Sequence, residues 1–535
     1  MTRWDRRRAT LTMAALAAAG ALRAPPAQAA GATGGAAAGA GADFDALRAR
    51  LAAGKTSAVE MVRAAQRRMD ALDARGPCLR AVIERNPDAR KLAAERDAAR
   101  RAGQAPLSPI DGLPVLLKDH IATGDRMRTS AGSYALAGAP AARDAFLVAR
   151  LRAAGAVILG KTNLSIWANI RSVRSTSGWS ARGGQTRNPY ALDRNPSGSS
   201  SGSAVAVAAG YAALAVGTET DGSIVSPAST CGIVGIKPTV GLVSRDGIVP
   251  ISQSQDTAGA MASSVRGAAA LLSVLAAPDE RDPAAAGSAP AADYLAACHR
   301  GGLGGARLGV VRSVFGDHPG VRGCMQAAIE RMRAAGATII DPVDLVPSKS
   351  YEDAELEVLL TELRAGLERY FGAFAPDAPV HNLAELIEWD RQHETSEMPL
   401  FGQELFERAA AFGPIDGPGY RTARESCLRG SRTEGIDATL ARHRLDALLA
   451  PTNDPAWLTD PVNGDSPKGG FSTPPAVAGY PHITVPAGFV DGLPIGISFV
   501  AGAFREARLF DLAYDYEQAS LARRPPQFLA TVAKA

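Results

Sequence analysis

The sequence has few histidines and lacks a concentrated run of basic residues. Its 535 residues include seven histidines, none of them spaced like metal ligands, and the segment HETSEM at 393 lacks the second histidine of a zincin motif. No run of lysines and arginines forms a basic stretch that would mark a nucleic-acid partner. The net charge is +4, and residues 1–29 supply all of it, so the rest of the chain is close to neutral. We therefore expect neither a metal site nor a nucleic-acid partner.

The sequence also lacks a hydrophobic run long enough to span a bilayer. The apolar stretch at 9–22 is shorter than the roughly 20 residues of a membrane span and ends near prolines. A basic start precedes it, and Ala27-Gln28-Ala29 follows it, which together are typical of an export signal over 1–29. Arg6, Arg7 and Arg8 resemble a twin-arginine signal, which predicts a periplasmic or secreted protein. The alternative is a lipid-embedded anchor, but we expect no stable membrane insertion once the signal is removed.

Cysteines are equally sparse. The sequence has five, without Cys-x-x-Cys spacing: Cys78, Cys231, Cys298, Cys324 and Cys427. We expect buried thiols, although an oxidising compartment leaves room for one disulfide.

What the chain does have is the pattern of one large α/β domain. A Gly/Ala-rich tether at 30–42 precedes residues 43–74, where apolar residues recur at helical spacing and Ser57-x-x-Glu60 forms a capping box. From 110 onward, short apolar runs bounded by glycine alternate with helical patterns, and a strand pattern returns at 476–502. Strands from both halves of the chain are thus expected in one sheet, within a domain over 43–525. No internal repeat is present.

Residues 351–411 differ in composition from the segment before them. They are rich in Glu, Leu and Arg and therefore predict helices. We expect a helical insertion around 351–440 that supplies residues of a substrate pocket.

Three polar side chains stand at the ends of apolar runs. In SGSSSGSAVAVAAG (197–210), Ser199 and its neighbours precede a helix-compatible run of alanine and valine. Ser223 lies in GTETDGS, a turn after a predicted strand, where consecutive backbone N–H groups can bind an anion. Lys118 ends the run LPVLLK, and burial there can lower a lysine pKa by about 3–5 units.

Together these segments resemble the amidase signature family of serine hydrolases. The resemblance covers about residues 43–520 and rests on six motifs in family order: GLPVLLKD, SGSSSGSAVAVAAG, GTETDGSI, CGIVGIKPTVGLVSRDGIVPIS, SQDTAGAM and VAGYPHITVPAGFVDGLPIG. It implies a single domain with a central mixed β-sheet covered by helices on both faces. It also implies amide hydrolysis without a cofactor, through a Ser-Ser-Lys set on Lys118, Ser199 and Ser223.

The implied chemistry assigns a task to each group. A serine hydroxyl attacks poorly unless a base removes its proton. Neutral Lys118 would take a proton from Ser199, which would take one from Ser223, whose Oγ attacks the amide carbon; water would later release the acyl group. The resemblance places the oxyanion hole on the backbone N–H groups of Thr220, Asp221, Gly222 and Ser223. Ser200 and Asp119 are expected to support the site.

The residues by themselves leave other interpretations open. Lys118 could be a surface lysine paired with Asp119, and the serines could be turn or capping residues. Ser200 also satisfies Gly-x-Ser-x-Gly, the nucleophile elbow of α/β-hydrolases, but that motif needs a strand directly before it, whereas two prolines precede Ser200. An exported ligand-binding protein on this scaffold, without turnover, is a further alternative.

Several positions depart from the common family pattern. Ser197 and Ser201 stand where glycines are usual, and we expect little effect on the site because serine is also small. Ile166 replaces an acid and Val225 an arginine. The segment Glu219-Thr220-Asp221 resembles peptide amidases, which favours C-terminal peptide amides as substrates. Aryl or aliphatic amides are the alternative. Resemblance to the glutamyl-tRNA amidotransferase component of this family is a further alternative, against which the export signal argues.

Overall fold

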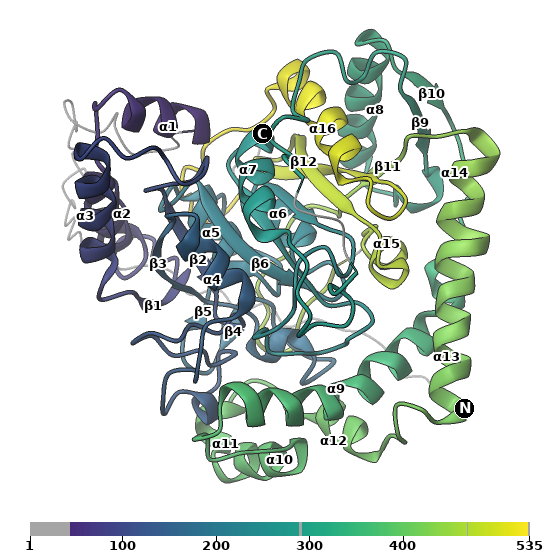
Figure 1. Ribbon diagram of the computed structural model, residues 1–535. Helices are drawn as coiled ribbons and strands as arrows, with labels where there is room; N and C mark the ends of the chain where they lie inside the picture. Colours follow the sequence, from purple (N-terminus) through teal and green to yellow (C-terminus); the bar gives the residue numbers. More distant parts are fainter. Residues whose placement is uncertain (1–42, 288–291, 468, 533–535) are drawn as a thin grey trace, which may run out of the picture. The chain divides into compact units, whose positions relative to one another are not determined.

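A mixed sheet of eleven strands runs through the protein (Figure 1). The computed structural model describes residues 43–287, 292–467 and 469–532. The predicted export signal (1–29) and tether (30–42) lie outside the described residues. In spatial order the strands are β1 (Val82–Arg85), β3 (Val157–Thr162), β2 (Pro114–Lys118), β6 (Leu214–Glu219), β8 (Thr257–Ala262), β7 (Val234–Lys237), β12 (His482–Val490), β13 (Leu493–Val500), β11 (Ala447–Pro451), β9 (Arg307–Val310) and β10 (Thr338–Ile340).

Parallel and antiparallel pairs both occur in this sheet. β2 pairs in parallel with β3 and β6, whereas β6–β8, β8–β7, β7–β12 and β12–β13 are antiparallel. Every residue of β2, β3 and β6 is buried, as expected for parallel strands covered on both faces. The short glycine-bounded apolar runs of the sequence are these strands.

Helices pack on both faces of the sheet, as the alternation along β6 shows. A Cβ built on Gly267 of α7 (Val265–Leu275) would lie 3.3 Å from Leu214, whereas one built on Gly217 would lie 2.8 Å from Ser200, next to α5 (Ser201–Ala208). Because side chains alternate along a strand, Leu214 and Gly217 face opposite sides. The predicted fold class is therefore confirmed.

Three further helices complete the two layers. α6 (Val225–Thr230) packs with α5 on one side, while α8 (Pro319–Ala334) and α16 (Glu506–Ser520) join α7 on the other. α4 (Phe146–Ala153) also packs against α7.

The helices expected near the beginning of the domain are α1 (Phe44–Ala52) and α2 (Ala58–Leu72), followed by α3 (Ala89–Arg101). The predicted capping box is present at the start of α2. Ser57 Oγ accepts from the Glu60 N–H at 3.1 Å, and the Ser57 N–H donates to Glu60 Oε2 at 2.9 Å. These two bonds satisfy donors that the first helical turn leaves unpaired.

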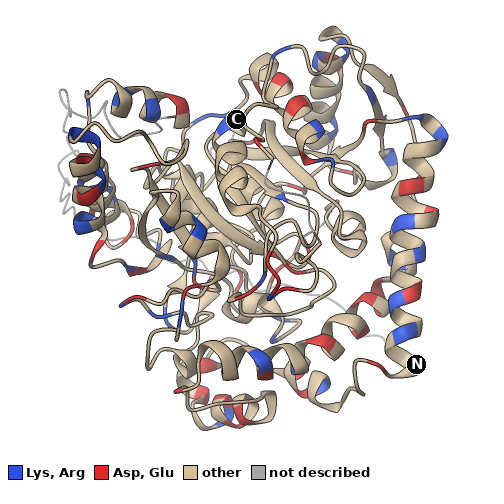
Figure 2. Ribbon diagram, in the orientation of Figure 1, with Lys and Arg blue, Asp and Glu red and all other residues tan. Residues whose placement is uncertain are grey.

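The segment predicted to be helical around 351–440 consists of helices α9 to α14. Figure 2 shows positive and negative residues interspersed along α9 and α13, and the buried faces of α9 carry leucines and aromatics. The helices are α9 (Glu352–Phe374), α10 (Leu383–Gln392), α11 (Glu394–Glu397), α12 (Glu404–Ala411), α13 (Pro418–Leu428), a π-helical stretch (Arg429–Ile436) and α14 (Asp437–His443).

Within the described ranges, no helix has the length and hydrophobicity that crossing a membrane requires. All five cysteines are described and free; Cys231, Cys298 and Cys427 are buried, as expected, but Cys78 and Cys324 are only half-buried.

Candidate active site

Lys118 is the last residue of β2 and is completely buried between β3 and β6. Its Nζ lies 2.7 Å from Ser199 Oγ, 2.9 Å from Thr218 Oγ1 and 3.1 Å from the Thr218 carbonyl oxygen. Burial lowers the pKa of Lys118 from 10.5 to about 7, although the negative charges of Asp256 and Glu219 oppose that change. A large share of Lys118 is therefore an uncharged amine at neutral pH.

The three neighbours of Nζ suit this uncharged form. The Thr218 carbonyl oxygen can only accept a hydrogen bond, so one amine hydrogen points to it. The Thr218 hydroxyl can accept the second hydrogen. The lone pair of the amine then faces the Ser199 hydroxyl, which can donate its proton along the same 2.7 Å contact. Lys118 is thus not a surface lysine paired with Asp119.

Ser199 is held just ahead of α5. Its side chain is buried, its carbonyl oxygen accepts from the Ser165 N–H at 3.1 Å, and the Gly198–Ser199 peptide bond is cis.

Ser223 lies in the loop between β6 and α6. Its carbonyl oxygen accepts from the Ser200 N–H at 3.1 Å, which fixes the loop against the residue that follows Ser199. The Ser223 hydroxyl forms no hydrogen bond with a described residue, and no described residue accepts from the backbone N–H groups of Asp221, Gly222 or Ser223. The structure thus joins Lys118 to Ser199 directly and Ser223 to them through the backbone.

Glu219 shapes the loop that carries Ser223. Its buried carboxylate accepts from the N–H groups of Ile224 at 2.7 Å and Val225 at 3.0 Å, the residues at which α6 begins. Burial raises the pKa of Glu219, and the positive charge of Lys237 acts in the opposite direction. The carboxylate therefore ties the end of β6 to the start of α6 around Ser223.

Replacing Glu219 with alanine should destabilise the protein by about 2 kcal/mol, because two buried N–H groups lose their acceptor. Urea unfolding followed by circular dichroism measures this change. Glu219→Gln is the matched control, since an amide oxygen can still accept, and it should cost less than half as much. Equal losses in both variants would contradict this role.

Asp256 also holds this loop in place through hydrogen bonds. It accepts from the Thr220 hydroxyl at 2.6 Å and from the N–H groups of Ile251 and Ser252, each at 2.8 Å. Burial raises the pKa of Asp256 to about 6, although these bonds favour its ionised form.

The two residues predicted to support the site have different surroundings. Ser200 is buried, and its hydroxyl donates to the Thr218 carbonyl oxygen at 3.0 Å and accepts from the Thr218 N–H at 3.2 Å. No strand lies between Gln185 and Ser200 in this fully described segment, so the nucleophile elbow is absent. Ser200 connects α5 to β6 next to the lysine contact.

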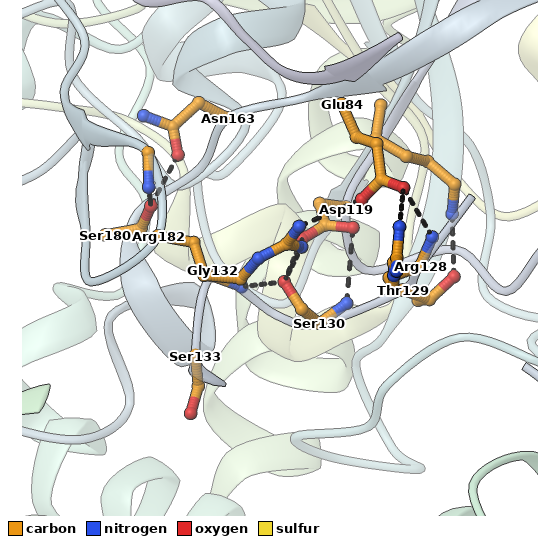
Figure 3. A network of polar contacts seen from close by, with 12 residues as sticks. Glu84, Asp119, Arg128, Thr129, Ser130, Gly132, Ser133, Asn163, Ser180 and Arg182 are labelled. Carbon is orange, nitrogen blue, oxygen red and sulfur yellow. Dashed lines mark hydrogen bonds and ion pairs between the residues drawn. The ribbon is translucent and has the colours of Figure 1, made fainter. Parts of the chain in front are cut away.

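The Asp119 carboxylate belongs to a polar network with Ser130 and Arg182 (Figure 3). It accepts from the Ser130 N–H at 3.2 Å and from the Ser130 hydroxyl, and it lies 3.7 Å from a guanidinium nitrogen of Arg182. Arg182 in turn pairs with Glu84 at 2.9 Å. Asp119 therefore makes no bond with the lysine beside it in the sequence.

A pocket of about 510 Å³ opens beside the two serines. Gly198 and Gly222, the residues directly before Ser199 and Ser223, line it. Glu352, at the start of α9, is the lining residue that the helical segment contributes. Among the described residues, no group of three or more His, Cys, Asp or Glu side chains could hold a metal ion.

Sequence reasoning gave no role to Thr218 or Asp256, and it used Glu219 only as an indicator of the substrate class. For the two acids a signal was available, because carboxylates in otherwise apolar segments are rarely buried without partners. No sequence signal pointed to Thr218.

Comparisons with known proteins show the family of the chain. The family model described as Amidase matches residues 60–510. A probable amidase from Arabidopsis thaliana is 40% identical over 86% of this chain and 87% of its own length. A component of the glutamyl-tRNA(Gln) amidotransferase from Symbiobacterium thermophilum is 37% identical over 87% of this chain and 94% of its own length.

A solved structure has a higher sequence identity to this chain than these two relatives have. The native peptide amidase from Stenotrophomonas maltophilia is 51% identical, with a TM-score of 0.87 over 91% of this chain and 98% of that one. The family match and the shared fold lead to one conclusion: the chain belongs to the amidase family and is an amide-hydrolysing enzyme.

Proposed function

We propose that the enzyme hydrolyses amides through an acyl-enzyme on Ser223, with Lys118 as general base and Ser199 as the relay between them. The observation that carries this proposal is the buried Lys118 amine, with a pKa of about 7, at 2.7 Å from the Ser199 hydroxyl. An exposed lysine, with a pKa of about 10.4, would be almost fully protonated at pH 7 and could not accept the proton.

The reaction follows from these groups. Lys118 takes the Ser199 proton, Ser199 takes the Ser223 proton, and Ser223 Oγ forms a bond to the amide carbon. The backbone N–H groups of Thr220, Asp221, Gly222 and Ser223 stabilise the oxyanion; loss of one such donor elsewhere costs about 3–4 kcal/mol. The relay then returns a proton to the nitrogen, the C–N bond breaks, and ammonia or an amine leaves. Water then gives a proton to the same relay and attacks the acyl carbon; the ester bond to Ser223 Oγ breaks, Ser223 regains its proton, and the carboxylic acid leaves.

C-terminal peptide amides are the proposed substrates. The 51% identity to a peptide amidase and the Glu219-Thr220-Asp221 segment support this choice. Aryl or aliphatic amides are the competing substrates. A scaffold that binds such ligands without turnover is disfavoured because Lys118, Ser199 and Ser223 are all retained.

A fluorophosphonate probe and an ammonia assay test this proposal together. The probe should label Ser223, identified by peptide mass spectrometry, and should not label the Ser223→Ala variant. Ammonia release should be fastest on peptide amides within a panel that also holds aliphatic amides and aryl anilides. Labelling at Ser200 would contradict the mechanism, and turnover of aliphatic amides alone would contradict the substrate class.

We also propose that the mature protein is periplasmic or secreted, exported by the twin-arginine-like signal at 1–29. Cell fractionation of the full chain tests this location. Changing Arg6, Arg7 and Arg8 to lysine should retain the protein in the cytoplasm. Retention of the unchanged chain there would contradict the proposal and would favour a role like that of the amidotransferase relative.

A further inference from the structure

The pocket beside the two serines is acidic. Asp221, Glu352, Asp454 and Asp465 line it, and Asp454 has an interaction with another group; none of the other described lining residues is a lysine, arginine or histidine. Asp465 has structural partners, since it accepts from the Ser177 N–H at 3.0 Å and from the Trp457 indole at 3.2 Å. Glu352 is exposed at the first turn of α9 and has no hydrogen bond or ion pair with a described residue.

Asn453 supplies independent evidence that the pocket accepts hydrogen bonds. It lines the pocket, is only 5% exposed, and its Nδ2 donates to the Ser226 carbonyl oxygen at 3.3 Å and to Ser226 Oγ at 2.9 Å. Because a carbonyl oxygen cannot donate, these bonds fix which end of the amide is nitrogen. Asn453 Oδ1 is then left without a partner among the described residues.

Asp221 presents a second unpaired acceptor. One of its oxygens accepts from the Thr473 hydroxyl at 2.7 Å, and the other, Oδ1, has no partner among the described residues. Burial raises the pKa of Asp221, hydrogen bonding to Ser472 and Thr473 and the positive charge of Lys237 lower it, and the negative charge of Glu352 adds a small increase. Lys237 does not line the pocket. Buried acceptors without donors cost free energy that a ligand rich in N–H groups would recover.

We propose that this pocket selects amides whose acyl part carries a positive charge, with Glu352 and Asp221 as the specificity-determining residues. The inference rests on the proposed amide hydrolysis, because Gly198 and Gly222 place the pocket next to the scissile carbonyl. The charge is an ammonium, supplied either by a basic side chain or by the free α-amine of the terminal residue. Asn453 Oδ1 would accept one of its N–H groups.

Calorimetric binding to the Ser223→Ala variant tests the inference independently of turnover. The probes are N-acetyl-lysine amide, with a side-chain ammonium; norleucine amide, with a free α-ammonium; and N-acetyl-norleucine amide, which is neutral. At least one ammonium probe should bind roughly three- to tenfold more tightly than the neutral amide at low salt, and the difference should shrink at high salt. The tighter probe identifies the source of the charge.

Variants of Glu352, made in the Ser223→Ala background, test whether this residue causes the preference for an ammonium group. Glu352→Gln should remove most of the preference, and Glu352→Lys should reverse it in favour of N-acetyl-glutamate amide. Asp353→Asn, an exposed neighbour that does not line the pocket, should keep the preference. Equal or tighter binding of the neutral amide, or an unchanged preference in Glu352→Lys, would overturn the inference. Absence of turnover in the unmodified enzyme would instead contradict the proposed function.

Discussion

Replacing Lys118 with methionine should lower kcat/KM by roughly 10⁴-fold, because the relay loses its only base. Methionine fills nearly the same volume, so the buried end of β2 keeps its packing. Substituting an apolar side chain for a buried amine is often neutral for stability, and we therefore expect a folded protein. Steady-state kinetics on a peptide amide, together with circular dichroism, separates lost chemistry from lost structure.

Lys161 offers a matched control for this variant. It is equally buried, lies in the adjacent strand β3, and donates to Thr129 Oγ1 at 2.7 Å rather than to a serine of the site. Burial lowers its pKa to about 8, so its electrostatic environment is similar. Lys161→Met should keep activity within about tenfold of the unmodified enzyme. Comparable losses in the two variants, or more than a hundredth of the activity left in Lys118→Met, would contradict the assignment.

Ser223→Ala should be the most damaging single change to activity, with a loss of roughly 10⁴- to 10⁶-fold in kcat. The Ser223 hydroxyl forms no hydrogen bond with a described residue, so its removal should leave the melting temperature nearly unchanged. Single-turnover assays with mass spectrometry should detect an acyl-enzyme in the unmodified protein and none in the variant.

Ser200→Ala tests the neighbouring hydroxyl in the same assay. Ser200 bonds only the backbone of Thr218, so its loss should lower activity by about tenfold through the placement of β6. A loss of activity as large as that of Ser223→Ala would indicate that Ser200 is the nucleophile.

Much of the fold was predictable because its elements depend on local patterns. The run that ends at Lys118 is β2, the alanine and valine run after Ser200 is α5, and the capping box at Ser57 starts α2. The spatial order of the strands was not predictable from such patterns. β12 lies between β7 and β13, and its pairing with β7 joins His482 to Lys237, a long-range contact that no local pattern specifies.

The candidate site was also predictable only in part. Sequence motifs predicted Lys118, Ser199 and Ser223 as site residues, whereas Thr218 and Asp256 contact this region through hydrogen bonds between distant segments. Likewise, Asp221 and Glu352 both line the acidic pocket although they are 131 residues apart in the sequence.

At Ser197 the backbone conformation matters as well as the small size of the side chain. Its φ of +61° lies in the left-handed region, which costs a residue other than glycine about 1–2 kcal/mol. Hydrogen bonds offset part of this cost, since Ser197 Oγ lies 2.8 Å from Ser226 Oγ and the Ser201 hydroxyl donates to the Ser197 carbonyl oxygen at 2.6 Å.

The dependence of kcat/KM on pH tests the uncharged lysine most directly. The ammonium form of Lys118 cannot accept a proton, so activity on a neutral peptide amide should rise about tenfold per pH unit below the lysine pKa and level off above it. The account predicts that this change occurs at a pKa of about 7. A rate that keeps rising toward pH 10.5, the value of an unshifted lysine, would contradict it.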